Sequence, residues 1–308
     1  MLVALTLACV RPSTEVPTVA TPPTEPGELT AWLAAEEARF DDLVPGAEKH
    51  IQWVHPEAPA KTDLAVVYLH GFSATRQEVA PLCERLGDAL HANVYFARLA
   101  GHGRSDDAMA EATLDAWKQD AREAWAIGRT LGDKVLLVST STGGTLATWL
   151  ATTVPQDELE AMVLMSPNFF PKDGTARLLT WPGRKLVLKA AVGDTREWEP
   201  ANEGQSTFWT WRYPSSALLP MMDLVRLVEL SDVSRITTPA LLITSPNDEV
   251  INSATAQERF ADFGSTRRDT WLIEQVGDAS NHVLAGDILS PENTTPTLDR
   301  ILAFVQTR

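Results

Sequence analysis

One strand-to-helix junction constrains the fold of this chain more than any other segment does. An apolar run at 135–139 ends abruptly in a turn of small hydroxyl residues, and a helical pattern begins at Gly144. Apolar, β-branched runs of this length are typical of buried strands. A strand that turns sharply into a helix around a serine has the form of a nucleophile elbow. The apex backbone of such a turn is strained, so that its side chain projects clear of the sheet.

Two serines compete for the apex of this turn. With Ser139 at the apex, Leu137 would stand two residues before it, where the turn is too tight for a leucine. With Ser141 at the apex, the flanking residues are Ser139 and Gly143, which are both small. We therefore predict Ser141 as the nucleophile, with Ser139 replacing the first glycine of the usual G-x-S-x-G pattern. The alternative is a Ser/Thr-rich turn that only caps a helix.

Strand-like runs alternate with helix-like stretches along most of the chain. The predicted strands are 51–54, 64–69, 94–99, 135–139, 162–165, 240–244 and 270–274. The predicted helices are 76–90, 114–131, 144–153 and 298–305. Continuous apolar strands that alternate with helices indicate an α/β fold, with a mostly parallel sheet covered by helices on both faces. Functional sites in such sheets form at the carboxyl ends of the strands.

Composition divides the chain into three regions. Residues 1–27 join an apolar start to a stretch rich in proline and threonine, which predicts a signal or lipoprotein-like segment followed by a disordered tether. Residues 28–166 and 236–308 carry the alternating pattern and are expected to form the α/β core. Residues 167–235 break that pattern and are rich in Pro, Trp and Phe, so we expect an inserted cap there.

The apolar start of the chain ends in Leu7-Ala8-Cys9, which is typical of a bacterial lipoprotein signal with Cys9 as the lipidated residue. We expect a membrane tether through Cys9 and an exported protein, either anchored to a bacterial membrane or periplasmic. The positively charged residues that normally precede such a segment are missing from the sequence. A chance cysteine in a frayed terminus of a cytoplasmic protein is therefore the alternative.

Charge and cysteine content exclude several classes of function. The chain has 26 Lys and Arg against 41 Asp and Glu, which gives a net charge of −15. Nucleic acid is not an expected partner, because phosphate binding needs clustered basic residues. The 2 cysteines and 6 histidines show no metal-ligand spacing, and we expect no metal or organic cofactor.

A serine nucleophile needs a neighbouring base, and the base needs an acid that orients it. After a nucleophile elbow the acid comes next in the sequence and the histidine comes last. His282, just beyond the strand at 270–274, is the one histidine in the second half of the chain. Asp248 follows the strand at 240–244 and is the predicted acid. Its neighbour Glu249 is the alternative, disfavoured because the apolar pair after it is expected to anchor the next helix.

An oxyanion hole needs two backbone N–H groups. One is expected from Thr142, which follows the nucleophile, and the other from the loop after the strand at 64–69. In that loop Gly71 permits close approach of the backbone, and the N–H of Phe72 is the predicted second donor. His70 stands in the wrong chain order for a catalytic base, so we expect it to brace this loop.

At these positions the chain resembles the α/β-hydrolase superfamily, and within it the capped bacterial carboxylesterases and monoacylglycerol-lipase-like serine hydrolases. The motifs that carry the resemblance are His70-Gly71-Phe72, Ala100-Gly101-His102-Gly103, the turn at 139–143, Asp248 and Asn281-His282. The resemblance implies hydrolysis of a small-molecule carboxylic ester through an acyl-enzyme, without a cofactor.

The substrate is expected to be chosen in the predicted cap. Phe170, Trp209 and Trp211 are candidates for an apolar substrate pocket, and the alternative is that they form the cap's own core. Aromatic residues and an acidic chain favour neutral esters of short to medium acyl length, or monoacylglycerol-like esters. The same triad also serves amidases, lactonases and acyltransferases. The alternative outside the enzymes is a catalytically silent hydrolase fold that binds a ligand.

Overall fold

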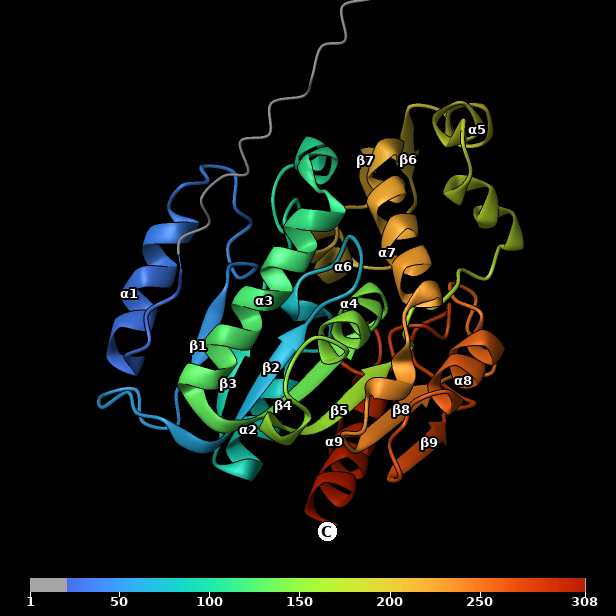
Figure 1. The fold of residues 1–308 in the computed structure, drawn as a ribbon. Helices are drawn as coiled ribbons and strands as arrows, with labels where there is room; N and C mark the ends of the chain where they lie inside the picture. Colours follow the sequence, from blue (N-terminus) through green and yellow to red (C-terminus); the bar gives the residue numbers. More distant parts are fainter. Residues whose placement is uncertain (1–20, 308) are drawn as a thin grey trace, which may run out of the picture.

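The fold is built on one large sheet in which the order of the strands differs from their order in the sequence. The computed structural model describes residues 21–307, so that Cys9 and most of the predicted segment 1–27 lie outside the described residues. Seven strands pair in the order β1-β3-β2-β4-β5-β8-β9 (Figure 1). All neighbours are parallel except β1, which runs antiparallel to β3 at one edge. The predicted α/β class is therefore confirmed.

The strands lie close to their predicted positions. Their bounds are β1 His50–Gln52, β2 Thr62–Leu69, β3 Asn93–Phe96, β4 Gly132–Thr140, β5 Leu159–Met165, β8 Ala240–Thr244 and β9 Arg268–Leu272. Consecutive side chains of a strand point to opposite faces. On β2, Val67 and Leu69 join the core on one face of the sheet, whereas Val66 and Tyr68 join the core on the other. Both faces are thus buried, which is why the central strands are apolar throughout.

Helices cover both faces of this sheet. Their bounds are α1 Pro26–Glu37, α2 Leu82–Leu90, α3 Leu114–Leu131, α4 Thr142–Ala151, α7 Leu218–Leu230, α8 Ser253–Ala261 and α9 Pro291–Gln306. Buried residues of α1, α3, α4, α7 and α8 belong to one core, and those of α2 and α9 belong to the other. Figure 1 shows α3 and α4 side by side in front of the central strands. Within residues 21–307, no helix is both long and apolar enough to cross a membrane.

One predicted helix is wrong in a way that affects the site. The range 76–90 is not continuous: a 3-10 turn at Arg76–Glu78 is followed by a break, and α2 begins only at Leu82. Pro81 precedes α2 and has no N–H with which to continue a helix from the turn. Glu78 consequently lies in a buried connection instead of on a helix surface.

The segment between β5 and β8 is a succession of short elements. It contains a 3-10 helix Gly174–Thr180, α5 Arg184–Ala191, β6 Thr195–Glu197, α6 Glu203–Phe208 and β7 Arg212–Pro214, and then α7. Figure 1 shows α5 at an outer corner of the molecule, while α7 returns toward α4. Because Leu224 and Val228 of α7 are part of the main core, the last helix of this segment also belongs to the packing of the sheet.

Candidate active site

Ser141 occupies the sharp turn between β4 and α4. Its backbone has φ 52° and ψ −118°, a strained conformation that only a tightly packed turn maintains. The residue two positions later must be small, because a Cβ on Gly143 would lie 2.1 Å from the carbonyl oxygen of Leu69. Ser141 is the first residue before α4, yet its side chain forms no hydrogen bond that caps the helix. Its hydroxyl is therefore free to bond elsewhere.

Three of the predicted residues meet at the carboxyl edge of the sheet. His282 Nε2 lies 2.9 Å from Ser141 Oγ, and His282 Nδ1 lies 2.8 Å from Asp248 Oδ2. The Asp248 carboxylate accepts a hydrogen bond from Nδ1–H, which leaves Nε2 as an acceptor for the serine hydroxyl. The three side chains come from the ends of β4 and β8 and from the loop after β9. The structure thus brings together groups that lie 141 residues apart in the sequence.

Asp248 is held by the backbone that follows it. Its Oδ1 accepts hydrogen bonds from the N–H groups of Val250, at 2.8 Å, and Ile251, at 2.9 Å. The carboxylate is fully buried, whereas the neighbouring Glu249 is exposed. These bonds leave Oδ2 directed at His282. Of the two carboxylates in this loop, only Asp248 contacts the histidine.

Asp278 shapes the loop that carries the histidine. Its Oδ2 accepts the N–H of His282 at 3.0 Å and of Val283 at 2.9 Å, together with the hydroxyl of Ser280 at 2.6 Å. Sequence reasoning did not assign this residue a role. An Asp four residues before the histidine in a loop is a signal for such a turn, because Asp side chains bond to nearby backbone N–H groups.

The pKa of His282 is raised above its usual 6.5. Burial alone would lower this pKa, but the charge and hydrogen bond of Asp248 outweigh burial, and the charges of Asp278 and Glu78 add to the increase. Each of these carboxylates stabilises a protonated imidazole. The surroundings of His282 therefore favour the imidazolium, which forms when the ring takes the proton of Ser141.

The loop after β2 lies directly against the elbow. A Cβ on Gly71 would be 3.3 Å from Ser141 Cβ, which is tighter than an ordinary contact, so the glycine favours this close approach. In the described part of the chain, the backbone N–H groups of Phe72 and Thr142 have no hydrogen-bond acceptor. Two free donors beside one hydroxyl form the arrangement that an oxyanion hole requires.

His70 braces this loop, as its position in the chain suggested. The N–H of Leu99 donates to His70 Nε2 at 3.0 Å, so the proton of the ring lies on Nδ1, which donates to the carbonyl of Gly71 at 2.9 Å. Burial lowers the pKa of His70 well below its usual range, and the ring is neutral. His70 thus holds the backbone of residues 70–72, which we call the oxyanion loop. Of these two histidines, only His282 bonds to Ser141.

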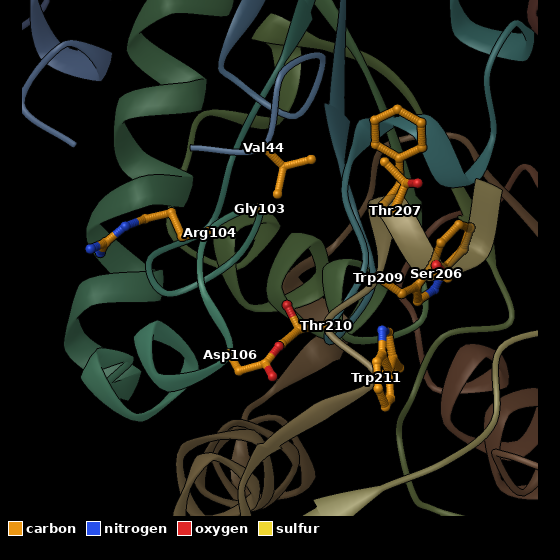
Figure 2. Close-up of a pocket in the computed structure, with 10 residues that line it drawn as sticks. Val44, Gly103, Arg104, Asp106, Ser206, Thr207, Trp209, Thr210 and Trp211 are labelled. Carbon is orange, nitrogen blue, oxygen red and sulfur yellow. The ribbon is translucent and has the colours of Figure 1, made fainter. Parts of the chain in front are cut away.

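The aromatic residues of the predicted pocket do not share one cavity. Trp209 and Trp211 line a cavity of about 120 Å³, together with Thr210 and, from a distant part of the sequence, Asp106 (Figure 2). Figure 2 also shows that Arg104 extends away from this cavity. Neither this cavity nor the one described next is lined by a residue of the Ser141 cluster.

Phe170 lines a second cavity of about 60 Å³, and Arg177 stacks over its ring at 4.8 Å. Trp209 is 8% exposed and packs with Ala74, Val283 and Leu289. Ala74 lies next to the loop after β2, and Val283 follows His282. Phe170 and the two tryptophans thus line separate cavities. Their contact with a substrate stays a prediction.

No metal site accompanies this arrangement within residues 21–307: no three His, Cys, Asp or Glu side chains there are grouped so that they could hold an ion. The chemistry available at the cluster is that of a hydroxyl, an imidazole, a buried carboxylate and two free N–H groups. Such a set can activate a serine and stabilise a negative oxygen.

The chain matches one protein-family model over most of its length. The family described as "Serine aminopeptidase, S33" matches residues 60–277. A thermostable monoacylglycerol lipase of Bacillus sp. (strain H-257) is 24% identical over 206 residues, which cover 67% of this chain and 79% of that protein. The residues matched by the family model, 60–277, include the elbow, Asp248 and the loop after β2, whereas His282 lies just beyond them.

Solved structures share the fold. A structure from work on the metagenome-derived lipolytic enzymes LipS and LipT is 22% identical, with a TM-score of 0.70, and the match covers 86% of this chain and 100% of that one. A monoacylglycerol lipase of Paleococcus ferrophilus is 17% identical, with a TM-score of 0.60, over 83% of this chain and 97% of that one. These likenesses confirm the expected α/β-hydrolase fold.

Proposed function

Because the chain belongs to the serine aminopeptidase S33 family of hydrolases, we propose that it is a serine hydrolase that cleaves carboxylic esters. Ser141 is the nucleophile, His282 the general base and Asp248 the acid that orients it. The observation that carries this proposal is the pair of hydrogen bonds at His282, 2.9 Å to Ser141 and 2.8 Å to Asp248. Hydrogen bonds on both sides of one imidazole are the geometry of an activated serine.

The reaction proceeds in two halves. His282 Nε2 takes the hydroxyl proton as Ser141 Oγ attacks the ester carbonyl, and Asp248 stabilises the resulting imidazolium. The N–H groups of Phe72 and Thr142 hold the oxyanion, each lowering the barrier by about 3 kcal/mol. The alcohol leaves with the proton from His282. Water, deprotonated by the same histidine, then releases the carboxylic acid and restores Ser141.

We assign the substrate to neutral esters of short to medium acyl length, including monoacylglycerol-like esters. The similarity to a monoacylglycerol lipase supports this class. Ser141 is 6% exposed and His282 8% exposed, which favours a substrate that can enter a nearly closed site. The net charge of −15 disfavours anionic substrates.

Hydrolysis of p-nitrophenyl esters of increasing acyl length tests this function. Wild type is expected to turn over the short and medium esters, and Ser141→Ala to lose that activity. Ser139→Ala is the matched control, because Ser139 is buried two residues away and bonds only to the carbonyl of Val163. Equal rates in wild type and Ser141→Ala would show that the elbow is misassigned. Faster turnover of an aminoacyl p-nitroanilide than of any ester would favour the aminopeptidase that the family description names.

A further inference from the structure

Glu78 is a buried carboxylate that contacts the oxyanion loop. It ends the 3-10 turn before α2 and is 2% exposed. Its Oε1 accepts the N–H of Gly71 at 2.6 Å and the hydroxyl of Tyr68 at 2.7 Å. Within residues 21–307 no Lys, Arg or His forms a salt bridge with this carboxylate. Burying a carboxylate without a cation costs free energy, and these two hydrogen bonds offset part of that cost.

The same carboxylate reaches the nucleophile elbow through one intermediate. The Tyr68 hydroxyl donates a hydrogen bond to Glu78. The oxygen of the same hydroxyl lies 2.8 Å from Thr140 Oγ1, so Thr140 is the donor to Tyr68. Thr140 is the residue immediately before Ser141. Two hydrogen bonds in series therefore join Glu78 to the start of the turn that presents the nucleophile.

The backbone around Glu78 also supports the histidine loop. The N–H of Asp287 donates to the carbonyl of Ala80 at 2.8 Å. Gly286 has φ 107°, and a Cβ there would lie 2.3 Å from the carbonyl oxygen of Glu78. The turn before α2 thus touches all three segments that carry the site: the oxyanion loop, the elbow and the loop after His282.

The direction of the Phe72 N–H depends on how the preceding glycine is held. Glu78 fixes the N–H of Gly71, and His70 Nδ1 fixes its carbonyl. In a trans peptide the N–H of the next residue points opposite to that carbonyl. Because hydrogen bonds hold both the N–H and the carbonyl of Gly71, the direction of the Phe72 N–H is fixed. Glycine would otherwise turn freely at this position.

We propose that Glu78 is a positioning residue, which fixes the Gly71–Phe72 backbone against the elbow so that the two oxyanion donors converge on one point. This inference rests on the proposed function of the site. Burial raises the pKa of Glu78 to about 7, against the opposing hydrogen bonds from Tyr68 and Gly71. Both hydrogen bonds need only an acceptor oxygen, so the residue acts through its bonds and an amide can replace it.

The test compares Glu78→Gln and Glu78→Ala in steady-state ester hydrolysis. Glutamine keeps an acceptor for Gly71 and Tyr68, so we expect its kcat within about threefold of wild type. Alanine releases Gly71, and we expect kcat to fall about 100-fold with KM within about threefold, because the lost contact acts on the transition state. Gln77→Ala is the matched control, since Gln77 lies in the same turn but bonds to Gly46. Its kcat is expected to stay at the wild-type value.

Tyr68→Phe keeps the proposal testable if Glu78→Ala does not fold. It removes one of the two hydrogen bonds that hold the Glu78 carboxylate, together with the link to Thr140, so we expect Gly71 to be held less firmly and kcat to fall about tenfold. The proposal is overturned if Glu78→Ala or Tyr68→Phe keeps kcat within about twofold of wild type. It is also overturned if Glu78→Gln loses as much kcat as Glu78→Ala, because the charge would then matter and not the hydrogen bonds.

Labelling with a fluorophosphonate separates this proposal from the ester assignment. Ser141 Oγ attacks phosphorus, fluoride leaves, and His282 takes the proton, while the phosphoryl oxygen occupies the oxyanion hole. Suppose that wild type is labelled but hydrolyses no ester. The ester assignment then fails, and the labelling rate still tests Glu78. We expect about 100-fold slower labelling of Glu78→Ala, and equal rates would overturn the proposal.

Discussion

The carboxyl edge of the sheet and residues 167–235, the predicted cap, are stabilised in different ways. At the edge, Ser141, Asp248 and His282 are nearly buried, and hydrogen bonds join each of them to another of the three. The outer part of the cap consists of short helices and exposes large apolar side chains, among them Trp181 and Leu186. Rigid placement suits bond making and breaking, whereas segments with fewer buried contacts open more easily, and we expect the choice of substrate there.

The two regions meet along a short stretch of the cap, residues 208–213, which we call the inner strap. The N–H of Thr210 donates to the carbonyl of Ser73 at 2.7 Å, just beyond the oxyanion loop. The rings of Phe72 and Tyr213 meet edge-on at 5.4 Å. Because these contacts fall on the oxyanion loop itself, the inner strap belongs with the edge of the sheet. Leu188 of α5 packs in the same apolar cluster as Tyr213, whereas Trp181 and Leu186 of the outer helices are exposed.

The largest effect is expected from removal of the base. His282→Ala should lower kcat by about 10⁴-fold or more, because Ser141 then has no group to accept its proton. His55→Ala is a suitable control, since that histidine is exposed and remote in sequence. A loss smaller than about tenfold in His282→Ala would show that another residue is the base. The carboxyl edge of the sheet would then not be the catalytic region.

Asp248→Asn should lower kcat by about 10³- to 10⁴-fold without removing the loop contacts. The asparagine oxygen can still accept from Val250 and Ile251, but its NH₂ group would then face His282 Nδ1. That donor favours the wrong tautomer of the ring. Glu249→Gln, at the exposed neighbour, is expected to keep wild-type activity. The reverse order of the two variants would make Glu249 the acid.

The pH profile of kcat/KM reports the protonation of His282. Neutral His282 is the active form, and its pKa is raised above 6.5 by Asp248, Asp278 and Glu78 against the effect of burial. Activity should therefore rise with pH and reach its plateau only above 6.5, falling about tenfold per unit on the acidic limb. Asp278→Asn should move this limb to lower pH. A limb that lies below 6.5 in wild type would contradict the electrostatic account.

The smallest effects separate the inner strap from the outer cap. Trp209→Ala removes a side chain that is 8% exposed and packed on Val283, so we expect kcat/KM to fall about tenfold together with a lower Tm. Trp181→Ala removes a side chain that is 62% exposed, so we expect the free energy of unfolding to change by no more than about 0.5 kcal/mol. Equal activity losses in both variants would show that the cap acts as one unit.

The fold was predictable, and so was the meeting of Ser141, Asp248 and His282 at one edge of the sheet, because the signals are local. A strand buried on both faces must be apolar along its length, and the turn around Ser141 admits only small neighbours. The predicted helix at 114–131 and the predicted strand at 240–244 therefore coincide with α3 and β8. The order of serine, acid and histidine then followed from the fold.

The supporting residues were not predictable from the same signals. Glu78 fell within an apparent helix at 76–90, and its role depends on Gly71 and Tyr68, which the fold brings to it. Asp278 could have been found from its turn, although its partners only become evident with the loop in place. The cap aromatics carry no periodicity that distinguishes a substrate wall from packing, which is why Phe170 and Trp209 were grouped although they line separate cavities.

Mass-spectrometric mapping of a fluorophosphonate adduct tests the central claim most directly. The wild-type protein should gain one adduct, on the peptide that contains Ser139 and Ser141, and fragmentation should place it on Ser141. Ser141→Ala should gain none, while Ser139→Ala should react as wild type does. An adduct on Ser139, or one that persists in Ser141→Ala, would contradict the assignment of the nucleophile and with it the account of the site.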